Sequence, residues 1–142
     1  MSSRRQFIKS GCAACILTAS GLSFLESCST PLPMIKVAGD NSNLIKINAD
    51  SFGPGKGNML VLRTKQLEYD ILLIKNAENY KALYLRCTHE GVGLTPAANK
   101  IFCSAHGSVF DLDGKVVKEP ALRPLQSYPT ELINNQIIIH LS

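Results

Sequence analysis

The sequence predicts a single all-β domain, and three observations support this expectation. From residue 34 onward, short apolar runs alternate with glycine, asparagine, aspartate and proline, which is typical of strands joined by turns. No window of a dozen residues in that region shows the sustained i, i+3, i+4 apolar spacing of a helix. The chain has 142 residues, of which 45% are hydrophobic and 18% charged, so we expect one packed core.

Each expected strand is an apolar run bounded by turn residues. Asp113 and Gly114 have the composition of a two-residue hairpin turn, because glycine adopts positive φ without a Cβ clash. Asn134 and Asn135 are expected to form a similar turn before the last strand. The expected strands are 35–37, 44–47, 59–63, 71–75, 81–87, 101–103, 108–112, 115–117 and 136–141.

The segment 53–58 reads Gly-Pro-Gly-Lys-Gly-Asn and invites comparison with a phosphate-binding loop. The residue after Lys56 is glycine rather than serine or threonine, and a strand rather than a helix is expected next. We therefore interpret this segment as a loop between strands and not as a nucleotide site.

The first 27 residues are predicted to be an export signal peptide. Arg4 and Arg5 resemble the twin-arginine signal, which exports proteins that are already folded. The apolar and small residues 11–25 that follow are fewer than the roughly 20 that a membrane-spanning helix needs. We therefore expect export, which suits a protein that acquires its cofactor in the cytoplasm.

The signal ends in Leu25-Glu26-Ser27-Cys28, which resembles a bacterial lipoprotein cleavage box. Cys28 would then be the lipidated first residue of the mature chain, although Glu26 departs from the usual small or apolar residue. The alternative is an unmodified Cys28 thiol after a cleavage site. These features divide the chain into a signal peptide (1–27), a tether (28–33) and a β domain (34–142).

Charge and cysteine content exclude several classes of protein. Removing residues 1–27 takes three basic residues and one acidic residue, so the formal net charge falls from +4 to +2. This weak excess argues against a nucleic-acid-coating or disordered chain. The domain retains Cys87 and Cys103, too few for a disulfide-dense secreted scaffold.

The two cysteines of the domain each stand close to a histidine. The first pair lies in Cys87-Thr88-His89, and the second lies in Cys103-Ser104-Ala105-His106. Two sulfur and two imidazole donors fit either a tetrahedral zinc ion or a two-iron cluster with cysteines on one iron and histidines on the other. Zinc fingers typically pair like ligands on each arm, so the mixed arms favour the two-iron cluster while zinc stays open.

These motifs resemble the Rieske iron-sulfur proteins. The resemblance rests on Cys87-Thr88-His89-Glu90-Gly91, on Cys103-Ser104-Ala105-His106-Gly107-Ser108, on the hairpin at 110–115, and on the proline-containing segment 120–125. It implies an antiparallel β-sandwich or barrel, with a cluster-binding subdomain formed by two hairpin loops. It also implies one [2Fe-2S] cluster per chain.

Carried over residue by residue, the resemblance makes Cys87 and Cys103 ligands of the inner iron, and His89 and His106 ligands of the outer iron. Family members that oxidise quinol usually carry a further cysteine in each loop, linked by a disulfide. Val92 and Ala105 occupy those places here. The resemblance thus implies a branch of the family without the bridge.

Two nearby residues are expected to set the reduction potential. Ser108 matches a family serine whose hydroxyl donates to a bridging sulfide, and it is therefore counted with the cofactor-binding residues. Phe110 occupies the place where high-potential members have a tyrosine that donates to a cysteine sulfur. Hydrogen bonds to sulfur stabilise the reduced form, so one retained donor and one missing donor predict an intermediate potential.

The function expected from these features is one-electron transfer by an exported, membrane-tethered protein. No second group of residues supports catalysis, so we expect an electron carrier or an oxidoreductase subunit rather than an enzyme by itself. Partners would be a redox protein or a quinol, with membrane attachment through a lipid or an uncleaved signal, and no nucleic acid. Alternatives are a small Rieske subunit of an arsenite-oxidase-like or quinol-oxidising complex, a cytoplasmic ferredoxin, and a structural zinc-binding interaction domain.

Overall fold

The computed structural model describes residues 31–38, 42–77 and 79–141 of the chain. The described residues form twelve β-strands and one short 3₁₀ helix, so the expected all-β class is confirmed. The elements are β1 (Met34–Val37), β2 (Leu44–Asn48), η1 (Ala49–Phe52), β3 (Met59–Thr64), β4 (Ile71–Asn76), β5 (Asn79–Tyr84), β6 (Thr95–Pro96), β7 (Ile101–Phe102), β8 (Val109–Phe110), β9 (Val116–Lys118), β10 (Ser127–Tyr128), β11 (Thr130–Ile133) and β12 (Gln136–His140).

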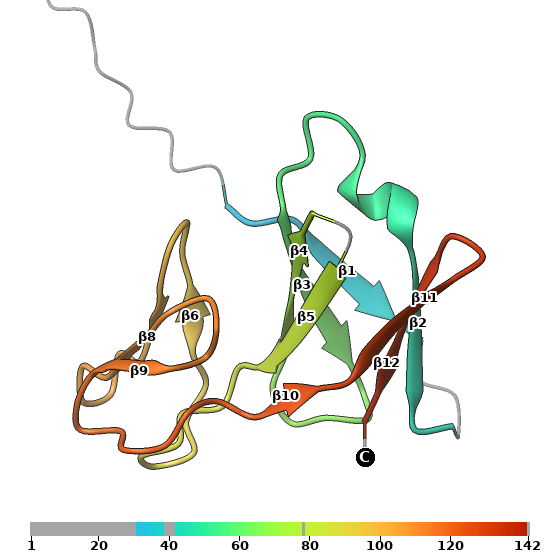
Figure 1. Ribbon diagram of the computed structural model, residues 1–142. Helices are drawn as coiled ribbons and strands as arrows, with labels where there is room; N and C mark the ends of the chain where they lie inside the picture. Colours follow the sequence, from blue (N-terminus) through green and yellow to red (C-terminus); the bar gives the residue numbers. More distant parts are fainter. Residues whose placement is uncertain (1–30, 39–41, 78, 142) are drawn as a thin grey trace, which may run out of the picture. The chain divides into compact units, whose positions relative to one another are not determined.

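The strands form three sheets (Figure 1). A five-stranded sheet has the order β1-β3-β4-β5-β10, a three-stranded sheet has the order β11-β12-β2, and a four-stranded sheet has the order β6-β7-β8-β9. All pairs are antiparallel except β1 and β3, which run parallel with Met34 opposite Val61. The four-stranded sheet carries the candidate cluster loops.

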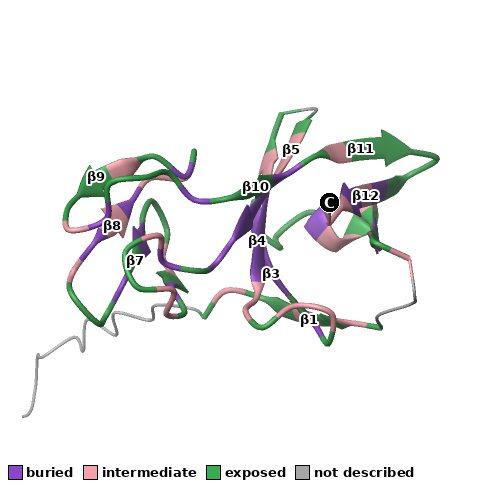
Figure 2. Cartoon of the chain, turned by 90° about the horizontal axis from the view of Figure 1, so that it is seen from below, coloured by how far each residue is buried: buried purple, intermediate pink, exposed green. Residues whose placement is uncertain are grey.

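The five-stranded sheet is buried on both faces at its centre, and Figure 2 shows β4 as a buried strand. This explains why β3 and β4 read as unbroken apolar runs, Met-Leu-Val-Leu and Ile-Leu-Leu-Ile, rather than as alternating patterns. Successive side chains of a strand point to opposite faces. Val61 and Leu72 therefore join one core, while Leu62 and Leu73 join the other.

The two cores have different partners. One packs Ile45, Ile137 and Ile139 of the three-stranded sheet against the five-stranded sheet. The other packs residues of the four-stranded sheet and of the candidate site against the opposite face, including Ile101 and Phe110. The candidate cluster loops are therefore supported by a packed hydrophobic core rather than by loop contacts alone.

One of the two predicted hairpin turns is confirmed and the other is corrected. Asn134 and Asn135 have φ of 49° and 63° and connect β11 to β12 as a two-residue turn. The connection after β8 is instead a three-residue loop, because Asp111 N–H donates to the Lys115 carbonyl at 3.0 Å. The Asp111 carboxylate also accepts from Lys115 N–H at 2.8 Å, so this side chain stabilises the longer turn.

The sequence patterns missed β6, β10 and β11. Pro129 lies between β10, which pairs with β5, and β11, which pairs with β12. Proline has no N–H to donate to a ladder, and the chain changes sheets at this point. The Pro129 carbonyl is used by β12, where it accepts from His140 N–H at 3.0 Å.

The strand expected at 81–87 ends earlier, at Tyr84. Arg86 N–H donates to the Tyr84 carbonyl at 2.9 Å, so the backbone turns sharply as it enters the first candidate loop. Segment 53–58 is confirmed as a loop before β3.

Lys81 of β5 forms an ion pair and hydrogen bond with Asp113 in the turn between β8 and β9. The hydrogen bond from Lys81 and its positive charge lower the pKa of the Asp113 carboxyl. The bond links the five-stranded sheet to the hairpin that follows the second candidate loop.

The predicted signal peptide (1–27), Cys28 and part of the tether lie outside the described residues. Across 31–38, 42–77 and 79–141, no helix reaches the length and apolar content that crossing a membrane requires. The division of the chain into signal, tether and domain stays a prediction.

Replacement of Gly114 by alanine tests how the hairpin formed by β8 and β9 packs on the five-stranded sheet. Gly114 has φ of +82°, and a Cβ there would lie 3.1 Å from Leu83 Cδ2. We expect Gly114→Ala to lower the free energy of unfolding by about 2–4 kcal/mol, from backbone strain plus overpacking. Urea unfolding followed by circular dichroism measures this loss.

Gly55→Ala is the matched control. Gly55 has φ of +79°, but a Cβ there would meet nothing within 4 Å. In this variant the free energy of unfolding should fall only by the cost of backbone strain, about 1–2 kcal/mol. Equal losses in the two variants would show that contact with Leu83 does not matter.

Candidate metal centre

The first candidate loop begins at Cys87, and backbone hydrogen bonds close it. Cys87 N–H donates to the Val92 carbonyl at 2.7 Å, and Gly91 N–H donates to the Cys87 carbonyl at 2.8 Å. Gly91 has φ of +75°, which glycine adopts without steric cost. The tight turn leaves His89 and Glu90 exposed at its outer end.

The second loop, between β7 and β8, repeats this geometry. Cys103 N–H donates to the Ser108 carbonyl at 2.9 Å, and Gly107 N–H donates to the Cys103 carbonyl at 3.0 Å. Gly107 has φ of +79°. Each turn therefore starts at a cysteine and ends at a glycine four residues later, although His106 stands one position nearer its glycine than the first histidine does.

Both cysteines are buried in the same hydrophobic core. Cys87 is 2% exposed and Cys103 is 3% exposed, and neither forms a disulfide. They pack in the cluster that also contains Ile101 and Phe110. The sulfur donors thus face an environment from which water is largely excluded.

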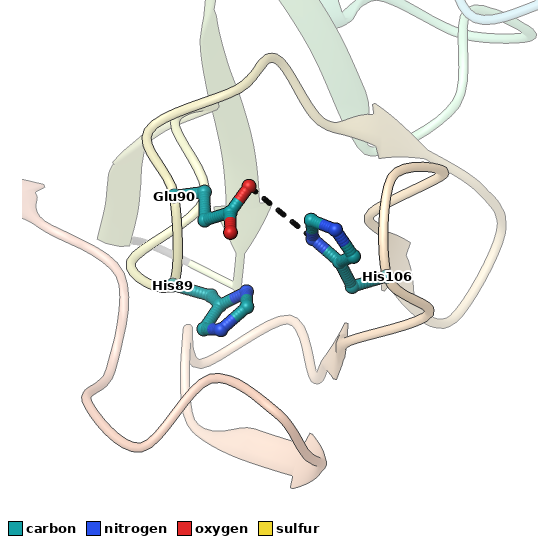
Figure 3. Close-up of side chains that lie close together, drawn as sticks. All are labelled: His89, Glu90 and His106. Carbon is teal, nitrogen blue, oxygen red and sulfur yellow. Dashed lines mark ion pairs between the residues drawn. The ribbon is translucent and has the colours of Figure 1, made fainter.

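The two histidines, in contrast, are exposed and lie close together (Figure 3). The centroids of the His89 and His106 rings are 5.1 Å apart, with 87° between the ring planes. Glu90 Oε2 lies 3.5 Å from His106 Nδ1. The structure therefore brings together the two imidazoles that the sequence motifs predicted as neighbours.

The segment at 120–125 is a third loop that contacts both cysteine loops. Thr88 Oγ1 donates to the Arg123 carbonyl at 2.6 Å. Ala121 N–H donates to Ser108 Oγ at 3.0 Å, and both residues of this second bond are fully buried. The third loop is therefore hydrogen-bonded to the first loop at one point and to the second loop at another.

The hydrogen bonds of the third loop connect two loops for which the resemblance implies no disulfide. Val92 is partly buried and packs against the core that holds both cysteines, whereas Ala105 is exposed. The loops are held together by apolar packing and by hydrogen bonds through the third loop.

The positions of the cysteine and histidine side chains bear on the choice between a single zinc ion and a two-iron cluster, the two metal centres that the sequence allowed. A single tetrahedral zinc requires four donor atoms around one point. Among the described residues, the ligand atoms of His89, Glu90 and His106 lie within 4.8 Å of one another at the surface, whereas both cysteines are buried in the core. A buried sulfur side and an exposed imidazole side fit a two-iron cluster with different ligands on each iron.

Comparison with known proteins identifies the family. A model of the Rieske [2Fe-2S] domain matches residues 47–129, more than half of the chain. The chain belongs to the Rieske [2Fe-2S] domain family. Its cofactor is one [2Fe-2S] cluster per chain, and its Rieske domain is an electron-transfer domain.

Individual relatives agree with this assignment. The chain is 26% identical over 125 residues to a cytochrome b6-f complex iron-sulfur subunit of Chlorobaculum thiosulfatiphilum, a match that covers 84% of this chain and 68% of the relative. It resembles the crystal structure of the cyanobacterial plasma membrane Rieske protein PetC3 from Synechocystis PCC 6803, with a TM-score of 0.53 and 28% identity over 66% of this chain and 96% of that one.

A more distant neighbour supports the fold alone. The ferredoxin of carbazole 1,9a-dioxygenase from Nocardioides aromaticivorans IC177 aligns with a TM-score of 0.51 and 17% identity, covering 68% of this chain and 94% of that one. The Rieske β-fold expected from the sequence motifs is confirmed.

The roles of individual residues stay predictions. Cys87, His89, Cys103 and His106 remain the expected ligands, and the geometry of the two loops supports this set. Ser108 remains the expected donor to a bridging sulfide. Its oxygen accepts from the Ala121 N–H, which leaves the hydroxyl hydrogen available for donation.

Sequence reasoning missed three contributors to the site. Glu90 was noted only as part of the motif, yet its carboxylate faces His106. The bond from Thr88 to the Arg123 carbonyl had no local signal, because its partner lies 35 residues away. The place of Arg86 beside Gly91 was also not predicted.

Thr88→Val tests whether the third loop holds the Rieske centre together. Valine keeps the volume of threonine but removes the hydrogen bond to Arg123, worth about 1 kcal/mol. We expect this variant to lose its cluster about fivefold faster in the presence of an iron chelator, followed by visible absorbance.

Ser104→Ala is the matched control, because Ser104 is exposed in the second loop and its side chain makes no hydrogen bond to the described residues. If both variants lose the cluster at the wild-type rate, the bond between Thr88 and the third loop does not stabilise the site.

Two variants test the side chains at positions 108 and 110 that are expected to control hydrogen bonding to sulfur, because the variants should change the reduction potential in opposite directions. Ser108→Ala should lower the potential, and Phe110→Tyr should raise it, because a hydroxyl donating to sulfur stabilises the reduced form. A hydrogen bond to a charged group is worth about 1.5–3 kcal/mol, which corresponds to a shift on the order of 60–130 mV for one electron. Protein-film voltammetry on cluster-loaded variants measures the shift, and unchanged potentials in both would contradict the assignment.

Proposed function

We propose that the protein is an exported, membrane-tethered carrier that passes single electrons from a donor enzyme or a quinol to an acceptor protein. The bound [2Fe-2S] cluster supplies the one-electron chemistry. The observation that carries the proposal is the pair of exposed imidazoles, His89 and His106, above two buried cysteines. A partner can approach the site from the histidine side, whereas the core covers the cysteine side.

The N-terminal sequence supports export and tethering. Arg4 and Arg5 match the start of a twin-arginine signal, and Cys28 stands where a lipoprotein would be cleaved and acylated. Export of a folded protein is compatible with insertion of the cluster before transport. The prolines of the tether then separate the lipid from the Rieske domain.

A second candidate is the small electron-transfer subunit of a larger complex, either arsenite-oxidase-like or quinol-oxidising. It is favoured by the matched relatives that are named as iron-sulfur subunits of cytochrome b6-f complexes. In that case the same exposed histidines would face a subunit of the complex rather than a diffusing partner.

Cell fractionation of a bacterium producing the full chain tests the proposal. We expect the protein in the membrane fraction of the envelope, with residues 1–27 removed and with the electron paramagnetic resonance signal of a reduced Rieske cluster. Cys28→Ser should release the protein from the membrane, because acyl chains provide the attachment. Replacing Arg4 and Arg5 together by lysine should retain the protein in the cytoplasm.

Three outcomes would separate the candidates. Cytoplasmic protein with residues 1–27 intact would contradict export. Purification as a stable heterodimer with a large catalytic chain would favour the subunit candidate. Absence of iron and sulfide from the purified protein would exclude electron transfer by this chain.

A further inference from the structure

Three exposed cationic side chains surround the site, one beside each of its loops. A Cβ on Gly91 would lie 2.9 Å from a guanidinium nitrogen of Arg86, so this side chain rests on the first loop. Lys118 Nζ lies 3.9 Å from the corresponding position on Gly107 in the second loop. Arg123 belongs to the third loop and lines, together with Arg86, an open cleft of about 510 Å³.

None of these three cations forms an ion pair with another residue that the structure describes. Two other cations of the domain do form ion pairs: Arg63 is held by Asp70 at 2.7 Å, and Lys81 is paired with Asp113. The carboxylate grouped with the histidines is that of Glu90. Three positive charges, set against the carboxylates of Glu90 and of the exposed Glu119 next to Lys118, leave this face with a net positive charge.

This local excess contrasts with the rest of the chain. After removal of residues 1–27 the whole protein carries a formal net charge of only +2, so its surface is nearly balanced. The field of an exposed charge decays over about 8 Å at physiological ionic strength. Cations that lie beside Gly91 and Gly107 are therefore close enough to act on a molecule approaching His89 or His106.

The third loop also exposes an apolar side chain next to Arg123. Leu122 is 80% exposed, although its neighbours Ala121 and Arg123 anchor the third loop to the other two. A large exposed apolar side chain at this position offers area that a docked partner would bury, while the cations would steer its approach. We call Arg86, Lys118, Arg123 and Leu122 together the basic face.

We infer that the basic face docks the electron-transfer partner, and that this partner is a redox protein with an acidic surface around its own cofactor. The inference rests on the proposed function. In the reaction, the reduced Rieske domain loses one electron and the partner gains it, and no bond forms or breaks. Opposite charges would accelerate the encounter and orient the two cofactors.

Two forms of one acceptor test the charge preference without any mutation. Mitochondrial cytochrome c is cationic, and succinylation of its lysines gives an anionic protein with the same fold and haem. We expect the reduced, cluster-loaded full chain in detergent to transfer electrons at least tenfold faster to the succinylated form at low ionic strength. Stopped-flow absorbance should show this advantage falling as salt is added, because salt screens the attraction.

Charge-neutralised variants locate the effect. The triple variant R86Q, K118Q, R123Q should lose at least tenfold in rate with succinylated cytochrome c at low salt, and its salt dependence should flatten. The matched control K36Q, K46Q, K56Q removes the same charge from exposed positions on β1, β2 and the loop before β3, and it should keep the wild-type salt dependence. The reduction potential of each variant is measured so that rates are compared at known driving force.

The outcomes separate this inference from the proposed function. Equal rates with both cytochromes, or a faster rate with the cationic form, would overturn the acidic partner while leaving electron transfer intact. Loss of binding to phosphatidylglycerol vesicles in the triple variant, with unchanged cytochrome rates, would assign the basic face to a lipid surface and also overturn it. Failure of the reduced protein to pass electrons to either cytochrome or to a small neutral quinone would instead contradict the proposed function.

Discussion

The expected ligand set imposes one constraint: two thiols from different loops lie inside an apolar core, while the imidazoles that belong to the same set are exposed to solvent. The fold meets this requirement by starting each loop at the boundary of the core. Cys87 and Cys103 pack with Ile101 and Phe110 and with the apolar face of the five-stranded sheet. Each loop then makes one tight turn, closed by a glycine, and the histidine lies on the part of the turn that faces solvent.

The third loop connects the two cysteine loops, which the resemblance says quinol-oxidising family members usually connect with a disulfide. A disulfide typically contributes about 2–4 kcal/mol, whereas each hydrogen bond contributes about 1 kcal/mol. The bonds from Thr88 to Arg123 and from Ala121 to Ser108 therefore act together with packing of Val92 on the core. Thiol reductants do not break such contacts, so the connection is independent of the redox state of the compartment.

The same few residues have both structural and electrostatic roles. Ser108 receives a backbone hydrogen bond from the third loop and is also the expected donor to a sulfide. Arg123 accepts the hydrogen bond of the first loop through its carbonyl, while its side chain contributes positive charge to the cleft beside that loop. The third loop therefore takes part both in the stability of the centre and in the proposed recognition of a partner, within a domain whose overall charge is nearly balanced.

The sequence by itself determined the all-β class, most strands, the Asn134-Asn135 turn and the two Cys and His motifs, because all of these depend on neighbouring residues. The four ligand roles remain predictions, although the geometry supports them. Only the tertiary structure decided which face of each apolar strand packs into which core, and that the chain passes from one sheet to another at Pro129. It also placed the third loop on the other two and left Arg86, Lys118 and Arg123 without an ion-pair partner among the residues that the structure describes. These features depend on contacts between residues far apart in the chain, which local patterns do not record.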